Sequence, residues 1–487
     1  MWLFVVGATG LILGNPEWRW PHQIIVPWLS VPVDELGRQH IRHPRDWVGQ
    51  LAIDPSNEQH VLSGGVGGLW LSTDRAASWQ PVAFEGERRT PQILQIATDS
   101  QGGWSPLLLA TDDGIWRFDP QRRAAQRYAL AGERITSLQI HPWTNSVIGV
   151  MQRTILFRFP LDAPLQVRLR RPAAIPVAGV PATTTLAKYG FDLHAVAGLP
   201  SLPISKAVND YAGIALPVLC VSGFLFWYLP RPRVRAGRRI PARVPVNVMR
   251  WLFRVHVFLA GLLVLIPLLY LGATGIAMGH KFGFSAWAKK IDLNSSSLTG
   301  NYDLRTLNDE LITVFAPSAD PDHLTALTRL GGLVSSDGGE TWVYDHSFPL
   351  KLMNYWAQAR YRMVSGYEFV SDEGNRLFTR RAGATEWIRH DAKAFGLLLD
   401  ARRVGSAVYL YTWYGSFRGD PESGFSSVAL PPAPLNGLDM AFLARVIHGL
   451  LIYHSVLVWF NDFGAVSLVL LALTGLIIWL ARSKKWM

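Results

Sequence analysis

The sequence predicts a membrane α-helical protein, with four transmembrane helices duplicated as 2+2, that carries an all-β, propeller-like periplasmic domain. The tetrapeptide Gly-Ala-Thr-Gly occurs twice, at Gly7–Gly10 and Gly272–Gly275, each time within an apolar run. Hydrophobic residues make up 49% of the 487 residues and gather in a few blocks. Long polar inserts separate these blocks, and each insert contains one Asp-box-like turn. Together these features indicate a helix–insert–helix unit that is built twice.

A transmembrane helix needs roughly 20 apolar residues. Residues 209–230 and 251–279 satisfy this length, as does the end of 446–482, which we expect to contain a periplasmic approach and the fourth helix. Residues 1–14 are too short to span. Because the second Gly-Ala-Thr-Gly follows a much longer apolar run, we expect helix 1 to be truncated at Met1; a cleaved signal peptide is the alternative.

The positive charge predicts how the helices are oriented. The net charge is +11, and seven arginines lie within residues 231–250, while Arg482, Lys484 and Lys485 follow the last apolar run. Short Arg/Lys-rich loops stay in the cytoplasm. The predicted cytoplasmic parts are therefore 231–250 and 483–487, and the inserts 15–208 and 280–445 face the periplasm of a bacterial inner (cytoplasmic) membrane. Membrane orientation explains this charge better than nucleic-acid binding does.

Each insert contains a hairpin signature of the Asp-box type. In this turn the Asp side chain caps backbone amides, Gly supplies a positive φ and Trp packs beneath. The second insert carries the full pattern, and the first a degenerate copy with Ala76 and Ser78 at the Gly and Thr positions. The predicted structural residues are Ser72, Asp74, Trp79, Ser335, Asp337, Gly339, Thr341 and Trp342.

The Asp-box turns resemble those of sialidase-like and photosystem-assembly-type β-propellers. A blade needs about 40–50 residues, so each insert has room for roughly three blades, too few for a closed ring. We therefore expect the two inserts to join into one propeller of about six or seven blades, with two independent small β domains as the alternative. Asp-boxes are structural turns, and no arginine triad with a tyrosine nucleophile marks a sialidase.

Histidines near the predicted membrane boundaries are the candidate cofactor ligands. His256 lies inside the third predicted span, where an ionisable residue is a functional hypothesis by default. His194, His448, His454 and His280 lie near the outer boundary. A pair of neutral imidazoles on facing helices can ligate haem iron, so we expect haem b, with His256, His194 and His448 as iron ligands. Interfacial histidines without a metal are the alternative. The single cysteine excludes a disulfide framework.

The membrane segments resemble the PepSY-associated transmembrane family. The residues that carry the resemblance are Arg254, His256, Thr274-Gly275, Leu193-His194, Ser222-Gly223, Trp227, Thr474-Gly475 and Trp479. The resemblance implies an inner-membrane protein of iron and siderophore handling, in which haem b carries electrons to a periplasmic ferric chelate. This chain departs from the family because propeller-like repeats stand where PepSY modules are usual.

Two function classes follow, and they differ in whether the protein is an enzyme. The first is a haem-dependent transmembrane reductase of a periplasmic acceptor such as a ferric chelate. The second is a non-enzymatic, membrane-anchored propeller that serves as a binding or assembly factor for a periplasmic or membrane protein. A transporter is weaker, because the spans lack broken helices and midplane acidic residues. The lipid membrane is a partner in every case.

Overall fold

A computed structural model shows two compact units, which are described separately. One unit comprises Met1–Val26, Ala182–Asp303 and Asp439–Met487, and the other Pro27–Pro181 and Leu304–Leu438. We call them the helical unit and the propeller. The structure describes residues 2–15, 18, 20–26, 50–65, 67–87, 90–98, 104–141, 143–171, 183–194, 202–230, 233–235, 238–240, 244–256, 265–279, 287–288, 290–294, 311–328, 331–350, 360–364, 366–371, 377–390, 398–404, 406–412, 415–428, 438–449, 463–470, 473–474 and 477.

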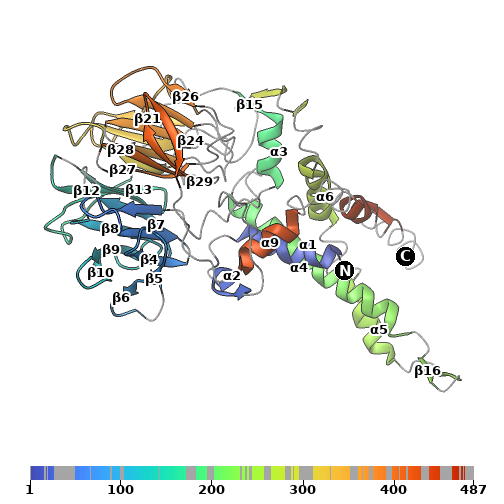
Figure 1. Ribbon diagram of the computed structural model, residues 1–487. Helices are drawn as coiled ribbons and strands as arrows, with labels where there is room; N and C mark the ends of the chain where they lie inside the picture. The colour runs from blue at the N-terminus through green and yellow to red at the C-terminus, as the bar shows by residue number, and fades with distance from the viewer. Residues whose placement is uncertain are drawn as a thin grey trace. The chain divides into compact units, whose positions relative to one another are not determined.

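The propeller consists of six sheets, which are its blades, three from each insert (Figure 1). Their strands pair antiparallel except for β6 in the second blade. Blade 1 contains β2 (Gln50–Ile53), β3 (Val61–Gly65), β4 (Gly68–Ser72) and β5 (Gln80–Pro81). Blade 2 contains β6 (Ala83–Phe84), β7 (Ile93–Thr98), β8 (Leu107–Thr111), β9 (Gly114–Asp119) and β10 (Ala124–Ala129). Blade 3 contains β11 (Ile135–His141), β12 (Ser146–Met151), β13 (Ile155–Pro160) and β14 (Arg168–Arg170). Blade 4 contains β19 (Leu311–Phe315), β20 (Leu324–Thr328), β21 (Gly331–Ser335) and β22 (Val343–Tyr344). Blade 5 contains β23 (Arg360–Val364), β24 (Tyr367–Ser371), β25 (Leu377–Arg381) and β26 (Ile388–His390). Blade 6 contains β27 (Leu398–Val404), β28 (Ala407–Thr412), β29 (Gly415–Asp420) and β30 (Gly424–Val428).

The six blades close into one ring. The innermost strands β2, β7, β11, β19, β23 and β27 contact one another in that order, and β27 returns to β2. The third and fourth blades meet through β11 and β19, although more than 100 residues of chain separate these strands. The propeller prediction is therefore confirmed, and both inserts belong to the same ring. Two independent small β domains are excluded.

Apolar side chains fill the space between neighbouring blades. One cluster joins blades 1 and 2 through Leu62, Ile96 and Trp116, and another joins blades 3 and 4 through Val150, Leu333 and Trp342. The two-residue strand β6 follows blade 1 in the chain but pairs in parallel with β10 of blade 2. Burial of these aliphatic and aromatic residues between sheets is the main force that holds a propeller together.

Polar side chains on the inner strands bind the backbone of the next blade. Gln95 of β7 donates to Leu138 O (2.7 Å) and accepts from Leu138 N (3.1 Å). Ser137 of β11 accepts from Val314 N at 3.2 Å, and Gln139 accepts from Ala316 N at 2.8 Å. These bonds satisfy buried backbone groups that have no ladder partner, and so they fix the register between blades.

His141, at the end of β11, makes the stability of the propeller depend on pH. It is 1% exposed, and its Nδ1 accepts hydrogen bonds from Trp143 N (3.3 Å) and Thr144 N (3.2 Å). Burial, with a smaller effect from Arg158, lowers the pKa of His141 below 6.5. As pH falls below 6.5, the unfolded chain takes up a proton before the folded protein does.

We therefore expect the free energy of unfolding to fall by at most about 1.4 kcal/mol per pH unit from this group, between pH 6.5 and its folded pKa. Asn keeps an acceptor near the Nδ1 position but does not titrate, so His141→Asn should flatten the slope. Urea unfolding between these pH values measures it. Equal slopes in the two proteins would contradict the assignment.

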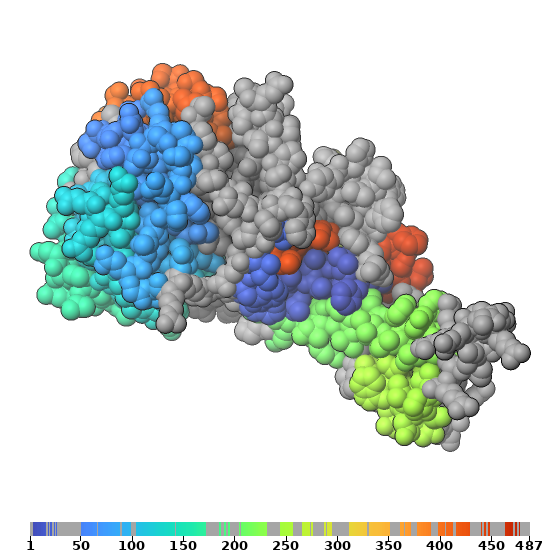
Figure 2. Space-filling model, turned by 60° about the horizontal axis from the view of Figure 1, so that its bottom comes forward, coloured from blue at the N-terminus to red at the C-terminus, as the bar shows by residue number. Residues whose placement is uncertain are grey.

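The helical unit contains helices and short β-ladders. Its labelled helices are α1 (Trp2–Gly14), α2 (Trp20–Gln23), α3 (Leu186–His194), α4 (Leu202–Tyr228), α5 (Val246–Phe253), α6 (Leu265–Gly279) and α9 (Met440–Gly449). Residues 463–470 are also helical. The paired strands are β1 (Ile25–Val26) with β31 (Leu438–Asp439), β15 (Thr183–Thr185) with β18 (Asp292–Asn294), and β16 (Arg233–Arg235) with β17 (Arg238–Ile240). Figure 2 shows α1, in dark blue, lying along the green α4.

Glycine permits the close approach of α1 to α4. A Cβ atom on Gly7 would lie 2.7 Å from Pro217 Cδ, and one on Gly213 would lie 3.1 Å from Leu11 Cβ. The first residue of the duplicated Gly-Ala-Thr-Gly is thus required for packing. Small residues at helix crossings allow this kind of contact between backbones.

The predicted fold class, four transmembrane helices plus a propeller, is wrong in its membrane part. The described chain is mostly β-structure, and in it one helix, Lys206–Tyr228, is long and apolar enough to cross a membrane, with a mean hydropathy of 1.6. Of the predicted third span, the structure describes residues 251–256 and 265–279, and both stretches are helical.

Candidate metal-binding site in the helical unit

Three of the predicted histidines have the same kind of polar neighbour. His194 is the last residue of α3, and its Nδ1 lies 3.0 Å from Thr274 Oγ1 of α6. His448, near the end of α9, places Nδ1 3.1 Å from Thr9 Oγ1 of α1. Thr9 and Thr274 are the threonines of the two Gly-Ala-Thr-Gly copies. The duplicated motif therefore provides a hydroxyl partner for a histidine in each repeat.

The neighbours of each hydroxyl group indicate which nitrogen of the ring carries the proton. Thr9 can donate its hydroxyl hydrogen to Val5 O (2.8 Å), and Thr274 can donate to Tyr270 O (2.8 Å). When they do, each threonine oxygen accepts a hydrogen bond from a histidine Nδ1–H. For His448 the carbonyl of Val6, 3.2 Å from Nδ1, selects the same tautomer. With the proton on Nδ1, a metal would be bound through Nε2.

His256 also has a hydroxyl group beside its Nδ1 atom, but none of the other predicted histidines lies next to it among the described residues. Its Nδ1 lies 3.0 Å from Ser222 Oγ of α4, and that hydroxyl donates to Leu219 O at 3.2 Å. The prediction that His256 is an inner ligand therefore stays a prediction, with its ring held in the suitable tautomer. His454 and His280 lie outside the described residues.

His194 and His448 are brought together by the fold, although 254 positions separate them in the sequence. Their ring centroids lie 6.5 Å apart, with the planes tilted by 39°. Metal–imidazole bonds are about 2 Å long, so two rings on opposite sides of one metal have centroids roughly 6 Å apart. The ring separation is of the size expected for two imidazoles bound to one metal ion. No group of three or more metal-ligating side chains occurs in the described part of the chain.

A glycine lies against each of these rings. A Cβ atom on Gly10 would be 3.1 Å from His448 Cε1, one on Gly223 would be 2.9 Å from His256 Cε1, and one on Gly275 would be 3.6 Å from His194 Cε1. Each glycine directly follows the hydroxyl residue. At Gly10 and Gly223 the pattern Thr/Ser-Gly thus supplies both a hydroxyl partner and room for the imidazole, whereas at Gly275 a Cβ atom would make an ordinary contact.

The hydroxyl partners were missed as site residues from the sequence. Thr9, Ser222 and Thr274 were noted only within apolar motifs, because nothing local indicates which distant histidine each one meets. The signal that could have found them is the duplication itself, since both copies of Gly-Ala-Thr-Gly keep the threonine next to the glycine.

The two Asp-boxes occupy equivalent turns of the propeller. Asp74 follows β4 of blade 1, and Asp337 follows β21 of blade 4, so each turn joins the third and fourth strands of the first blade in its insert. Asp337 accepts from Thr341 N at 2.9 Å, and Asp74 accepts from Ser78 N at 2.8 Å. Hydrogen bonds from Thr341 hold the pKa of Asp337 below its usual value.

The remaining Asp-box residues also have structural positions. Ser335 Oγ accepts from Gly339 N at 2.8 Å, and Ser72 Oγ accepts from Ala76 N at the same distance. Gly339 has φ +90°, whereas Ala76 adopts φ +68° in the degenerate copy. Trp342 is 1% exposed beneath its hairpin, and Trp79 is half-buried.

Comparisons with known proteins add little to this geometry. No family model matches the chain, and no curated protein matches it. An ancestral GH74 enzyme is similar at 9% identity and a TM-score of 0.35, over 82% of this chain and 39% of that one. The β-propeller domain of Myceliophteria thermophila Cps50 (Swd1) is similar at 11% identity and a TM-score of 0.34, over 82% of this chain and 88% of that domain. The chain thus spans well under half of the first structure.

The strands of the structure define the class of the protein, and the comparisons show no family. The described strands make it a β-propeller protein with an attached helical unit. The resemblance to the PepSY-associated transmembrane family is not supported, because no family model matches. Identities and TM-scores this low carry no inference about activity or partners.

Proposed function

We propose that this protein is a membrane-anchored β-propeller that binds a periplasmic or membrane protein partner. The observation that carries the proposal is the single closed ring, because it uses both long inserts of the chain for one rigid body. Propeller surfaces are well suited to binding, since a stable scaffold holds many loops and short outer strands. The attached helical unit would keep this surface at the membrane.

Exposed apolar side chains support membrane anchoring. On α4 they recur at helical spacing, and a second such row lies near the C-terminus. The exposed positions are Tyr211, Ile214, Val218, Val221, Phe224 and Tyr228, and Phe463, Val466, Leu470, Leu473 and Ile477. Rows of this kind are costly in water and favourable in lipid. The segments that precede and follow α4 in the chain both belong to the propeller ring. If α4 crosses the membrane, the chain must therefore cross back before residue 304.

The outermost strands of three consecutive blades supply a candidate contact surface. Leu169 of β14 is 57% exposed, Val343 of β22 is 68% exposed and Ile388 of β26 is 50% exposed. Outer strands also present backbone groups that no further strand covers. Such edges are the part of a propeller that an apolar or β-rich surface of a partner protein can bind.

Site-specific photocrosslinking in membranes tests this proposal. A photoreactive residue at Leu169, Val343 or Ile388 should give a discrete adduct with one protein, identified by mass spectrometry. The same residue at Arg75, an exposed position of blade 1, is the control. Replacing the adduct-forming residue with Asp should dissociate the co-purified partner. No adduct at any of the three positions, or equal adducts at Arg75, would reject the proposal.

A second candidate function is haem-dependent electron transfer, and one observation favours it: the neighbouring pair His194 and His448. Neutral imidazoles held by Nδ1 hydrogen bonds are suitable axial ligands for haem b. Bound haem would supply one-electron redox chemistry close to the membrane, toward an acceptor such as a ferric chelate. The threonines would orient the rings and keep Nδ1 protonated.

This second candidate predicts a spectroscopic loss. In purified full-length protein, His194→Ala or His448→Ala should abolish the Soret band of haem bound at this pair. Thr9→Val and Thr274→Val should weaken haem binding about 10–100-fold, because the ring loses its orienting partner. Titration with haem, followed by absorption, measures both effects, and His323→Ala in the propeller is the control. Colourless wild-type protein, or unchanged spectra in the double His variant, would eliminate haem at this site.

A further inference from the structure

One long run of the helical unit carries positive charge without any carboxylate. Residues 211–291 contain no Asp or Glu, yet seven arginines lie within residues 231–250 and Arg254 follows. We call residues 231–254 the arginine segment. Asp210, the last carboxylate before it, lies about 27 Å along α4 from Tyr228, at 1.5 Å per residue. Because charges are screened over about 8 Å at physiological ionic strength, Asp210 does not neutralise the arginine segment.

The backbone places some of these arginines in pairs of like charge. Arg235 of β16 lies directly opposite Arg238 of β17 in the ladder. On α5, Arg250 and the C-cap residue Arg254 are four positions apart, and both are exposed. Like charges that are opposed on a ladder, or four residues apart on a helix, are destabilising. An anion bound between the two members of a pair would make the pair stabilising.

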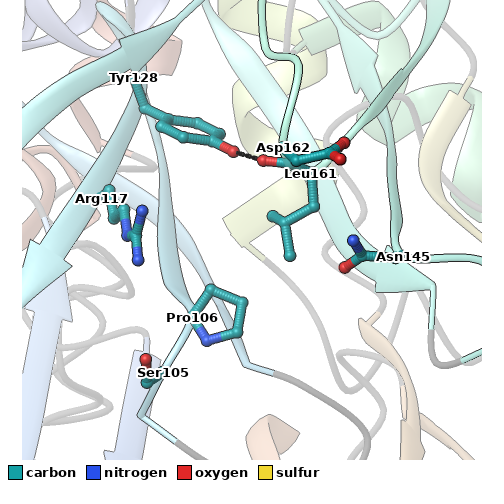
Figure 3. Close-up of a pocket in the computed structure, with 7 residues that line it drawn as sticks. All are labelled: Ser105, Pro106, Arg117, Tyr128, Asn145, Leu161 and Asp162. Carbon is teal, nitrogen blue, oxygen red and sulfur yellow. Dashed lines mark hydrogen bonds between the residues drawn. The ribbon is translucent and has the colours of Figure 1, made fainter.

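Exposed arginines of the propeller, in contrast, have carboxylates in their surroundings. Arg122 lies 3.8 Å from Glu85. Figure 3 shows a pocket of about 230 Å³ whose lining contains Asp162 as well as Arg117. The absence of carboxylates is therefore a particular feature of the arginine segment and its flanking helices.

Exposed aromatic side chains flank the arginine segment. Trp227 and Tyr228 at the end of α4 are exposed, and so is Trp251 of α5. The two helices contact each other, and the rings of Phe226 and Phe253 lie 6.3 Å apart, so these aromatic residues gather at one end of α4. Trp and Tyr are enriched where the hydrocarbon of a membrane meets the lipid headgroups. Arginines beside such residues are at the depth of headgroup phosphates.

We propose that the arginine segment binds the phosphate groups of anionic phospholipids. Arg235 with Arg238, and Arg250 with Arg254, each bind one headgroup, because a guanidinium can form two parallel hydrogen bonds to phosphate oxygens. A lipid with net negative charge is favoured over phosphatidylcholine, whose own quaternary amine offsets its phosphate. The inference rests on the membrane anchoring in the proposed function, to which it adds a class of lipid.

Lipid retention by the full-length protein tests this inference. The protein is held on an affinity resin, equilibrated with micelles that contain equal amounts of phosphatidylglycerol and phosphatidylcholine, and washed; the retained lipids are quantified by mass spectrometry. Phosphatidylglycerol should be retained at least about tenfold more than phosphatidylcholine. NaCl at about 1 M should remove most of this preference. Millimolar inorganic phosphate should not, because a free anion gains nothing from the apolar surroundings of a lipid.

Two double variants assign the preference to the paired arginines. Arg235→Gln/Arg238→Gln and Arg250→Gln/Arg254→Gln should each lower retention of phosphatidylglycerol at least about fivefold, since each removes two positive charges at the membrane surface. The matched control is Arg75→Gln/Arg122→Gln, which removes two exposed arginines from the propeller and should retain lipid as the wild type does. Each pair is on a separate element, so a folding defect in one variant leaves the other informative.

Three results would overturn the inference: equal retention of both lipids by the wild type, loss of phosphatidylglycerol to inorganic phosphate alone, or unchanged retention in both arginine variants. Flotation of the full-length protein with phosphatidylcholine vesicles measures membrane anchoring without an anionic lipid. Protein that floats but shows no lipid preference leaves the anchoring intact and removes the lipid site. Protein that does not float contradicts the anchoring itself.

Discussion

Replacing Asp400 with alanine is expected to lower the free energy of unfolding of the propeller by about 3–5 kcal/mol. Asp400 lies on β27 and is fully buried. Its carboxylate accepts from Arg362 Nε at 2.8 Å, from Arg402 at 3.0 Å and from Leu51 N of β2 at 3.1 Å. Removing it leaves two guanidinium groups and a backbone amide without their shared acceptor, at the junction where the last blade meets the first.

Asp400→Ala should also weaken the structure locally, around β2. Hydrogen exchange of the Leu51 amide and of its neighbours in β2 should accelerate, because Asp400 is the acceptor that ties this strand to β27. Urea unfolding, followed by the β-sheet signal of the full-length protein, measures the total effect. Asp400→Asn keeps the shape but not the charge and should lie between wild type and alanine.

An exposed ion pair provides the contrast. Glu58 binds Arg75 at 2.9 Å, yet both side chains are well exposed. Glu58→Ala should change the free energy of unfolding by less than about 1 kcal/mol, because water replaces the lost contact. If Asp400→Ala were as mild as Glu58→Ala, the buried network would not be what closes the ring.

Glu368→Ala should have the second large effect, a loss of about 3–4 kcal/mol. Glu368 of β24 is 2% exposed and accepts from Arg380 Nε at 2.9 Å and from the Tyr361 hydroxyl. Tyr361 is fully buried. Burial raises the pKa of both Glu368 and Tyr361, which shows how strongly this environment opposes charge without a partner. The alanine variant leaves the tyrosine hydroxyl and part of the guanidinium unsatisfied.

Other contacts of Arg380 limit how much stability the Glu368 variants lose. Arg380 also donates to Ser347 Oγ at 2.9 Å and stacks on Trp387, with its Cζ atom 4.4 Å from the ring centroid. Glu368→Gln should therefore recover most of the stability, since the amide oxygen still accepts. Glu386→Ala, at an exposed position of the same blade, is the control. Equal urea midpoints for Glu368→Ala and Glu386→Ala would show that the network contributes nothing measurable.

Local chemistry explains which parts of the fold were predictable. The Asp-box turns were found because their hydrogen bonds connect residues only two to four positions apart, as between Ser335, Asp337 and Thr341. The blade count followed from chain length, since each blade needs a nearly constant number of residues. The apolar runs, by contrast, suggested more spanning helices than the described residues contain.

The candidate sites depend on contacts that the sequence does not encode locally. The histidines were recognised from their place beside apolar runs, but the pairing of His194 with His448 required α3, α6, α9 and α1 to be packed together.

The sequence alone therefore determined the repeat, the hairpin turns and the presence of a propeller, because these depend on spacing and on residues near one another in the chain. Only the tertiary structure decided that both inserts share one ring, that Asp400 joins β27 to β2, and which hydroxyl contacts each histidine. Those contacts join residues far apart in the chain, and their free energy exists only once the intervening segments have folded.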